Sequence, residues 1–169
     1  MEFQLWNSLA AFPYNLRRCL LRGMLIFMNN GKDVKISVVV PCHNEEGSVL
    51  LLYNELRDTL SSQPDSYELI FVDDGSIDKS LEILKRFKIG NDHVRVFSFR
   101  KNQGKAEALT FGFQRAKGDY IVTLDADLQD RPTEIPKLLE KAKKGWDVVC
   151  GWRENRQDPF LKMHFVKSL

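Results

Sequence analysis

From residue 35 onward, short apolar runs alternate with segments in which apolar residues recur at helical spacing. The apolar runs predict strands at 36–40, 69–72, 94–99, 120–124 and 146–150. The periodic segments predict helices near 49–60, 77–87, 106–113 and 135–142. Strands that alternate with helices in this way indicate an α/β domain with a mainly parallel sheet covered on both faces.

Two helix starts have recognisable signals. Ser76 stands where it can cap the second predicted helix, with Ile77 as the first residue of its buried stripe. Pro132 and Pro136 fall around the first turn of the last predicted helix, where proline is tolerated. We therefore expect both helices to begin close to these residues.

The segment before the first predicted strand has a different character. An apolar stretch of about ten residues at 19–28 is interrupted by Arg22 and Gly23, and it is too short to span a membrane, which takes about 20 apolar residues. No small-residue cleavage site indicates a signal peptide. We expect residues 1–33 to be a weakly packed extension or a membrane-surface helix, with Met24 or Met28 as alternative natural starts.

Composition narrows the possible function classes. The 169 residues suit one domain, and 43% hydrophobic and 28% charged residues are typical of a globular protein. Because the net charge is only +2 and the basic residues form no stripe, we do not expect the protein to bind nucleic acid. The three cysteines lack metal-ligand spacing. Cys42 and Cys150 each end an apolar run and are interpreted as small buried hydrophobic residues in a reducing compartment, and no metal is expected at the lone His43.

Polar residues cluster directly after four of the predicted strands. In parallel sheets, ligands bind at the carboxyl ends of the strands, so these clusters are expected to meet at one edge. The clusters are 41–46, 73–78, 100–105 and 125–130.

The pair Asp125 and Asp127 is the sharpest chemical feature. Two carboxylates separated by one residue can face the same hard cation, which prefers oxygen ligands. Such a cation stabilises the charge that grows on a leaving diphosphate. An Asp-x-Asp pair is also common in ordinary loops, and it gains weight here from its place at a strand end.

The neighbouring acidic pair, Asp73 and Asp74, allows two interpretations. One carboxylate can accept hydrogen bonds from a base or a ribose, while Gly75 supplies a tight turn. The alternative is a capped turn with two solvated acids.

The remaining clusters are also open to two interpretations. Asn102, Gly104 and Lys105 precede a predicted helix, where backbone N–H groups and a lysine can meet phosphate; Lys105 can equally be an exposed first-turn lysine. Glu45 or Glu46 can help to seat a nucleoside, or can be a favourable charge near a helix N-terminus.

Five motifs in register resemble the family 2 glycosyltransferases, and most closely the polyprenyl-phosphate sugar transferases of the dolichyl-phosphate mannose synthase type. They are VVVPCHNEE, FVDDGSID, RKNQGKAEAL, GDYIVTLDADLQDRP and VVCGWRENRQD, from Lys35 to about Asp158. The resemblance implies the three-layer α/β/α, Rossmann-like GT-A fold over residues 34–158. It also implies an inverting transfer from a UDP- or GDP-linked sugar, with Mg or Mn as cofactor.

The resemblance and the polar residues at the strand ends and beyond together suggest roles for individual positions. The metal is expected at Asp125, Asp127 and Gln129. Catalytic roles are expected for Asp127, Arg153, Arg156 and Asp158. The nucleotide-sugar is expected to contact Pro41, Asn44, Glu45, Asp73, Asp74, Asn102, Gly104, Lys105, Asp125 and Gln129.

The acceptor is the least constrained part of the prediction. The resemblance implies a polyprenyl phosphate at the cytoplasmic face of a membrane as the preferred acceptor. A phosphate monoester has a second pKa of about 6 and is already largely anionic near neutral pH, so it needs no base. A saccharide or protein hydroxyl needs a base, for which Asp158 is a candidate; Asp158 can equally support Arg156 or lie exposed. Residues 159–169 are expected to begin a truncated acceptor-facing segment, so a domain that binds donor and metal with little turnover is a further alternative. The sugar, the nucleotide and the oligomeric state stay open.

Overall fold

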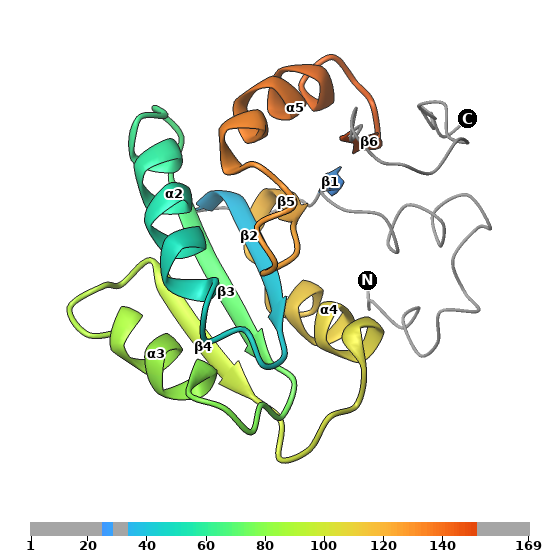
Figure 1. The fold of residues 1–169 in the computed structure, drawn as a ribbon. Coiled ribbons are helices and arrows are strands. Elements are labelled where there is room, and N and C mark those ends of the chain that lie inside the picture. The colour runs from blue at the N-terminus through green and yellow to red at the C-terminus, as the bar shows by residue number, and fades with distance from the viewer. Residues whose placement is uncertain (1–24, 29–33, 152–169) are drawn as a thin grey trace.

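A computed structural model of the chain describes residues 25–28 and 34–151. These residues form a six-stranded sheet with helices between most of its strands (Figure 1). The strands are β1 (Leu25–Met28), β2 (Val34–Cys42), β3 (Tyr67–Asp73), β4 (Val94–Ser98), β5 (Gly118–Thr123) and β6 (Val148–Cys150). The helices are α2 (Val49–Ser61), α3 (Ser80–Phe87), α4 (Lys105–Phe113), the 3₁₀ turn η2 (Pro132–Glu134) and α5 (Ile135–Ala142).

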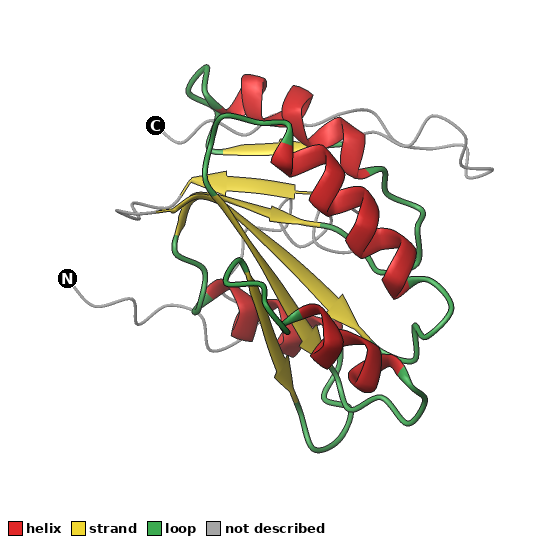
Figure 2. Ribbon diagram, turned by 90° about the vertical axis from the view of Figure 1, so that its left-hand side faces the viewer, coloured by secondary structure: helices red, strands yellow, loops and turns green. Residues whose placement is uncertain are grey.

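The strand order in the described part of the chain is β4-β3-β2-β5-β1-β6. The four strands from β4 to β5 are parallel to one another, and β1 runs antiparallel to both of its neighbours. The expected mainly parallel α/β sheet is therefore confirmed. The sheet twists strongly from one edge to the other, as the diverging strands in Figure 2 show.

Helices cover both faces of the sheet, which confirms the three-layer architecture. On one face, buried residues of α2, α3 and α5 pack against alternate strand positions such as Val38, Val40 and Phe71. On the other face, Ala108 and Leu109 of α4 pack against the intervening positions, including Val39 and Ile70. The alternation follows from the two-residue period of a strand, which points successive side chains to opposite faces.

The structure corrects the expectation for the end of the N-terminal extension. Residues 25–28 form β1, which pairs with β5 on one side and with β6 on the other. They thus belong to the sheet rather than to a weakly packed or membrane-surface segment. The apolar run is long enough for a short strand, and sequence periodicity over four residues does not distinguish strand from helix. Residues 1–24 lie outside the described part of the chain.

Two local expectations are also wrong. The second predicted helix begins at Ser80, where Asp78 Oδ1 accepts the Ser80 N–H at 2.9 Å, so Ser76 does not cap it. Ile77 precedes the helix and is 93% exposed. Strand β2 also continues through Pro41 to Cys42. Pro41 pairs with β3 but lies beyond the last residue of β2 that pairs with β5. Its missing N–H therefore leaves no acceptor of β5 without a partner.

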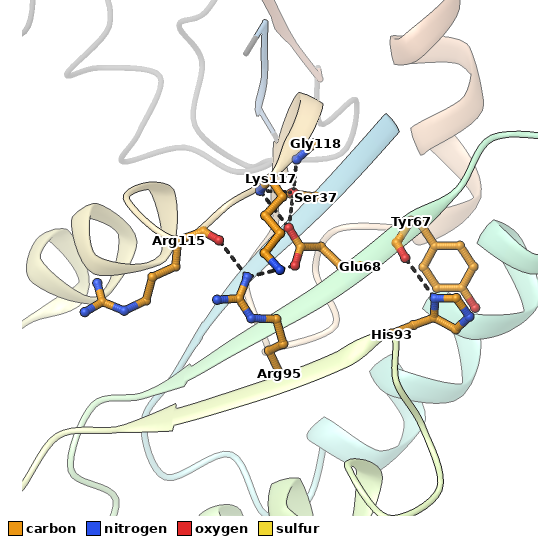
Figure 3. Close-up of polar contacts among 8 residues, drawn as sticks. All are labelled: Ser37, Tyr67, Glu68, His93, Arg95, Arg115, Lys117 and Gly118. Atoms are coloured by element: carbon orange, nitrogen blue, oxygen red, sulfur yellow. Dashed lines mark hydrogen bonds and ion pairs between the residues drawn. The ribbon is translucent and has the colours of Figure 1, made fainter. Parts of the chain in front are cut away.

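A polar network fastens the amino-terminal edge of the parallel strands (Figure 3). The almost fully buried Glu68 accepts hydrogen bonds through Oε1 from Ser37 Oγ (2.7 Å) and from the Lys117 N–H (2.7 Å). Its other oxygen, Oε2, pairs with Arg95 Nη1 at 2.9 Å, and the same Nη1 donates to the Arg115 carbonyl at 2.6 Å. One carboxylate therefore joins β2, β3, β4 and the turn that leads into β5.

We predict that Glu68→Ala lowers the free energy of unfolding by about 2–3 kcal/mol. The substitution removes the acceptor of the Ser37 hydroxyl and of a backbone N–H, and it leaves the Arg95 guanidinium without its carboxylate partner. Urea unfolding followed by circular dichroism measures the change. Glu82→Ala is the control, since Glu82 pairs with Arg86 at the surface (61% and 70% exposed side chains), and we expect a change below about 0.5 kcal/mol there. Equal losses in the two variants would contradict a structural role for the Glu68 network.

Candidate functional site

The four polar clusters lie at one edge of the sheet. Strands β2, β3, β4 and β5 are parallel, so the loops that follow them leave from the same edge. We call this edge the rim; its loops are residues 43–48, 74–79, 99–104 and 124–131. In Figure 1, the loops that follow β2, β3 and β4 lie together at the lower end of the sheet. This is the edge at which α/β sheets bind ligands.

The loops after β2 and β3 interlock through side chains that accept backbone N–H groups from each other. Asn44, whose φ is 56°, receives the Ile77 N–H on its Oδ1 at 2.9 Å and donates its own N–H to Ser76 Oγ at 3.0 Å. Glu46 and Asp78 form a similar exchange: Glu46 Oε2 accepts the Lys79 N–H at 3.0 Å, and Asp78 Oδ2 accepts the Glu46 N–H at 3.1 Å. Each loop therefore determines the shape of the other.

Glu45 is tied to the same interface and to the start of α2. Its N–H donates to Ser80 Oγ at 2.7 Å, while its carboxylate Oε2 accepts the Ser48 hydroxyl at 2.6 Å. Since the Glu45 side chain is only half-buried, part of it still faces solvent at the rim. Its expected contact with a nucleoside remains a prediction.

Asp73 ends β3 with its side chain inside the protein. It is 0% exposed, and its two carboxylate oxygens accept the Ser98 hydroxyl (2.8 Å) and the Ser76 N–H (3.3 Å). The carboxylate thus joins the end of β3 to the end of β4 and to the following turn. Neither Ser98 nor Ser76 carried a sequence signal for this role.

Asp74 is almost as deeply buried, at 3% exposure. Its Oδ1 and Oδ2 accept the N–H groups of Gln103 (2.7 Å) and Gly104 (2.8 Å), which immediately precede α4. Its own N–H donates to the Cys42 carbonyl at 2.7 Å. The interpretation of Asp73 and Asp74 as solvated acids is therefore wrong, because both carboxylates are engaged by donors within the protein.

Gly75 allows the two loops to approach each other. Its φ is 65°, and a Cβ at this position would lie 2.5 Å from the Lys101 carbonyl carbon. A larger residue would thus push the loop after β4 away from Asp74, which agrees with the tight turn expected from the sequence.

The loop after β5 carries the more accessible carboxylates. Asp125 is about one-quarter exposed and pairs with the ammonium group of Lys105, the first residue of α4, at 2.5 Å. Asp127 is exposed, and its Oδ1 accepts the Gln129 N–H at 3.0 Å. Leu128, between Asp127 and Gln129, has a φ of 63°, so the chain turns sharply at this residue. The structure thus brings Lys105 and Asp125 together from different strand ends.

The donor set suits a divalent cation that shares its coordination with a substrate. Asp125 and Asp127 offer carboxylate oxygens. The Lys105 ammonium group pairs with one of them, Asp125 Oδ1, and provides a positive charge where a cation would bind. In the part of the chain that the structure describes, no group of three or more His, Cys, Asp or Glu residues is arranged to hold a metal. Mg²⁺ commonly uses only one or two protein carboxylates and takes other ligands from phosphates and water. The residues present therefore fit such a cation.

His43 and Cys42, which lie beside the rim, are held by contacts within the protein. The His43 Nδ1–H donates to the Asp74 carbonyl at 2.8 Å, which leaves Nε2 to accept from the Asn44 amide at 3.2 Å. Cys42 is buried, and burial, followed by the negative charges of Asp73 and Glu45, raises the pKa of its thiol well above the ordinary value. His43 was given no metal from sequence, and its role in joining the loops had no sequence signal.

The other expected site residues divide into two groups. Pro41 is buried within β2, while Asn102 is exposed in the loop before α4. Arg153, Arg156 and Asp158 lie outside the described residues, so their expected catalytic roles stay predictions.

Comparison with known proteins identifies the family. The family model for glycosyl transferase family 2 matches residues 37–168. The chain therefore belongs to glycosyl transferase family 2. It is 44% identical over 129 residues to the undecaprenyl-phosphate 4-deoxy-4-formamido-L-arabinose transferase of Photorhabdus laumondii, a match that covers 76% of this chain and 40% of the relative. The chain thus spans about two fifths of the length of this curated relative.

Solved structures support the same fold. Glucosyl-3-phosphoglycerate synthase from Mycobacterium tuberculosis, in complex with Mn²⁺, UDP and glucosyl-3-phosphoglycerate, aligns with a TM-score of 0.50 and 29% identity over 64% of this chain and 39% of that one. S. aureus TarS 1–349 in complex with UDP aligns with a TM-score of 0.52 and 23% identity over 66% and 32% of the two chains. The expected GT-A fold is confirmed. Among the described residues, no helix combines the length and the apolar character needed to cross a membrane.

We predict that Asp74→Asn loosens the start of α4. The amide replaces one acceptor oxygen with an NH₂ group that faces a backbone N–H, and we expect a loss of about 2 kcal/mol in unfolding free energy. Hydrogen exchange at the Gln103 and Gly104 amides should accelerate at least about tenfold, as measured by NMR. Asp58→Asn, at an exposed site on α2, should leave those two rates unchanged. Unaltered exchange in Asp74→Asn would contradict the assigned role.

We also predict slow modification of Cys42 in the folded protein. Since its thiol pKa is raised, the folded state retains a proton that the unfolded state loses, and stability should fall as the pH rises above about 8.5. Iodoacetamide labelling at pH 8, located by peptide mass spectrometry, should leave Cys42 unmodified until urea is added. Rapid native-state labelling of Cys42 would contradict the buried placement.

Proposed function

We propose that this chain carries the donor-binding part of an inverting glycosyltransferase that moves a sugar from a UDP- or GDP-linked donor to a polyprenyl phosphate. The observation that carries the proposal is the rim, where Lys105 pairs with Asp125 and the exposed Asp127 lies two residues further along the same loop, in a chain that belongs to glycosyl transferase family 2. The named activity of the Photorhabdus laumondii relative supports the choice of a polyprenyl-phosphate acceptor.

The donor binds across the loops that follow β2 to β5 in this proposal. Pro41, Asn44 and Glu45 line the nucleoside side of the rim. Asp73 and Asp74 support that side from within, because their buried carboxylates fix the turns around it. Asn102 and the start of α4 face the diphosphate. The first N–H groups of a helix have no acceptor in the preceding turn, so Lys105 and Ala106 present both N–H groups and a positive partial charge to phosphate.

Asp125, Asp127 and Gln129 would hold the divalent cation, Mg²⁺ or Mn²⁺. When bound, this ion stabilises the negative charge that develops on the departing diphosphate. The presence of Mn²⁺ together with UDP in the Mycobacterium tuberculosis complex supports a metal in this role. Lys105 supplies a further positive charge at the same place, and the arginines Arg153 and Arg156 suit phosphate groups through their forked, always-charged donors.

The acceptor chemistry follows from the acceptor's own ionisation. A polyprenyl phosphate is largely anionic near neutral pH, since its second pKa is about 6, so its oxygen attacks the anomeric carbon without a protein base. The proposed transfer therefore does not need Asp158 as a base. In this proposal the protein works at the cytoplasmic face of a membrane, where the lipid phosphate is presented.

We predict that Asp127→Asn weakens Mn²⁺-dependent binding of the nucleotide by at least roughly 10-fold, because the loss of even an outer-shell partner costs that much and Asp127 is proposed as a direct ligand. Isothermal titration of the purified chain with UDP, GDP and their common sugar conjugates, with Mn²⁺ and then with excess chelator, measures this effect. In the unsubstituted chain, one nucleotide should bind, and its binding should vanish with the metal.

Asp92→Asn is the matched control. It makes the same charge change just before β4, at the opposite edge of the sheet from the rim, and should leave nucleotide binding unchanged. Nucleotide binding that survives both Asp127→Asn and chelation would contradict the site assignment. Binding without sugar transfer to undecaprenyl phosphate would instead favour a domain that binds donor and metal with little turnover.

A further inference from the structure

The contact between Lys105 and Asp125 is unusual because it occupies a proposed metal ligand with a side chain of the protein. The Lys105 ammonium lies 2.5 Å from Asp125 Oδ1, with side-chain exposures of 39% and 24%. Both groups are therefore accessible to solvent and to an incoming ion. A pair of this kind is weak enough to exchange partners, unlike the pair of Arg95 with the buried Glu68 carboxylate.

The backbone position of Lys105 is fixed by the residues that precede it. The buried Asp74 carboxylate holds the N–H groups of Gln103 and Gly104, the two residues immediately before Lys105. Gly104 adopts a φ of 100°, which turns the chain into the first residue of α4. The Lys105 backbone is thus fixed, while its four-carbon side chain keeps the freedom to move its charge over several ångströms.

We propose, resting on the function proposed above, that Lys105 is the resident counter-ion of Asp125 in the metal-free protein, and that it releases Asp125 when a divalent cation binds. The released ammonium then pairs with a phosphate oxygen of the donor. Lys105 therefore opposes metal binding before the nucleotide arrives and favours it afterwards. Metal and nucleotide consequently bind with positive cooperativity, because each makes room for the other's charge.

The two effects of Lys105 have opposite signs, which makes the proposal testable. Lys105→Met keeps an unbranched side chain of similar length but removes the charge. In the absence of nucleotide, we expect Mn²⁺ to bind this variant about two- to fivefold more tightly, the range that an exposed ion pair allows. In the presence of Mn²⁺, we expect UDP or GDP to bind it roughly tenfold more weakly, because a charged hydrogen bond to phosphate is lost.

The free Mn²⁺ signal in electron paramagnetic resonance measures the first affinity, and calorimetry with saturating Mn²⁺ measures the second. Lys88→Met is the matched control, since Lys88 is an exposed lysine at the C-terminal end of α3, away from the rim, and its removal makes the same change in net charge. It should change both affinities by less than about twofold. Thermal unfolding of each variant verifies that it is folded.

The outcomes separate this inference from the function on which it rests. If the unsubstituted chain binds Mn²⁺ with nucleotide, but Lys105→Met binds Mn²⁺ alone no more tightly, the exchange of partners is overturned while the donor site stands. An equal gain in Lys88→Met would also overturn it, since net charge alone would explain the change. If the unsubstituted chain binds no nucleotide under any condition, the proposed function itself fails.

Discussion

The Asp74 carboxylate accepts the N–H groups of Gln103 and Gly104, and this one interaction determines where α4 begins relative to β3. Gly75 makes it possible, because only a residue without a Cβ lets the chain at Lys101 approach so closely. Since Lys105 follows directly, the contact also decides that an ammonium group reaches Asp125 at the end of β5. The proposed donor site therefore depends on a carboxylate that is itself 3% exposed.

A second buried carboxylate stabilises the opposite edge of the same sheet. Glu68 joins β2, β3, β4 and the turn before β5 at their amino-terminal side, whereas Asp73 and Asp74 join the loops at the carboxyl side. Parallel strands are joined by long crossover connections rather than by tight hairpins, and the hydrogen bonds between strands do not hold the loops of these connections in place. Side-chain contacts of this kind do so. A rigid sheet with both edges fastened allows the rim residues to keep their relative positions.

The sequence predicted the sheet, its helices and the edge of the site, because apolar periodicity and strand-end polarity are local signals. It did not predict β1, since Leu25–Met28 is too short for its period to be read and its partners β5 and β6 lie far along the chain. It also misplaced Ser76, because hydrogen bonding to Asn44 across the rim outweighed the local preference for a helix cap. Contacts such as Asp73 with Ser98 depend on tertiary packing and leave no pattern in the chain.

The two acidic pairs illustrate how burial separates roles that look alike in the sequence. Asp73-Asp74 and Asp125-Ala-Asp127 both follow apolar strands, and either could have been the ligand-binding pair. A buried carboxylate is costly without fixed donors, and Asp73 and Asp74 have found theirs in serine and backbone groups of the fold. Asp125 and Asp127 remain accessible, and the Asp125 carboxylate pairs with the ammonium group at the end of a flexible lysine side chain. Accessible carboxylates can accept a cation and its diphosphate, so Asp125 and Asp127 are the pair that we propose to face the ligand.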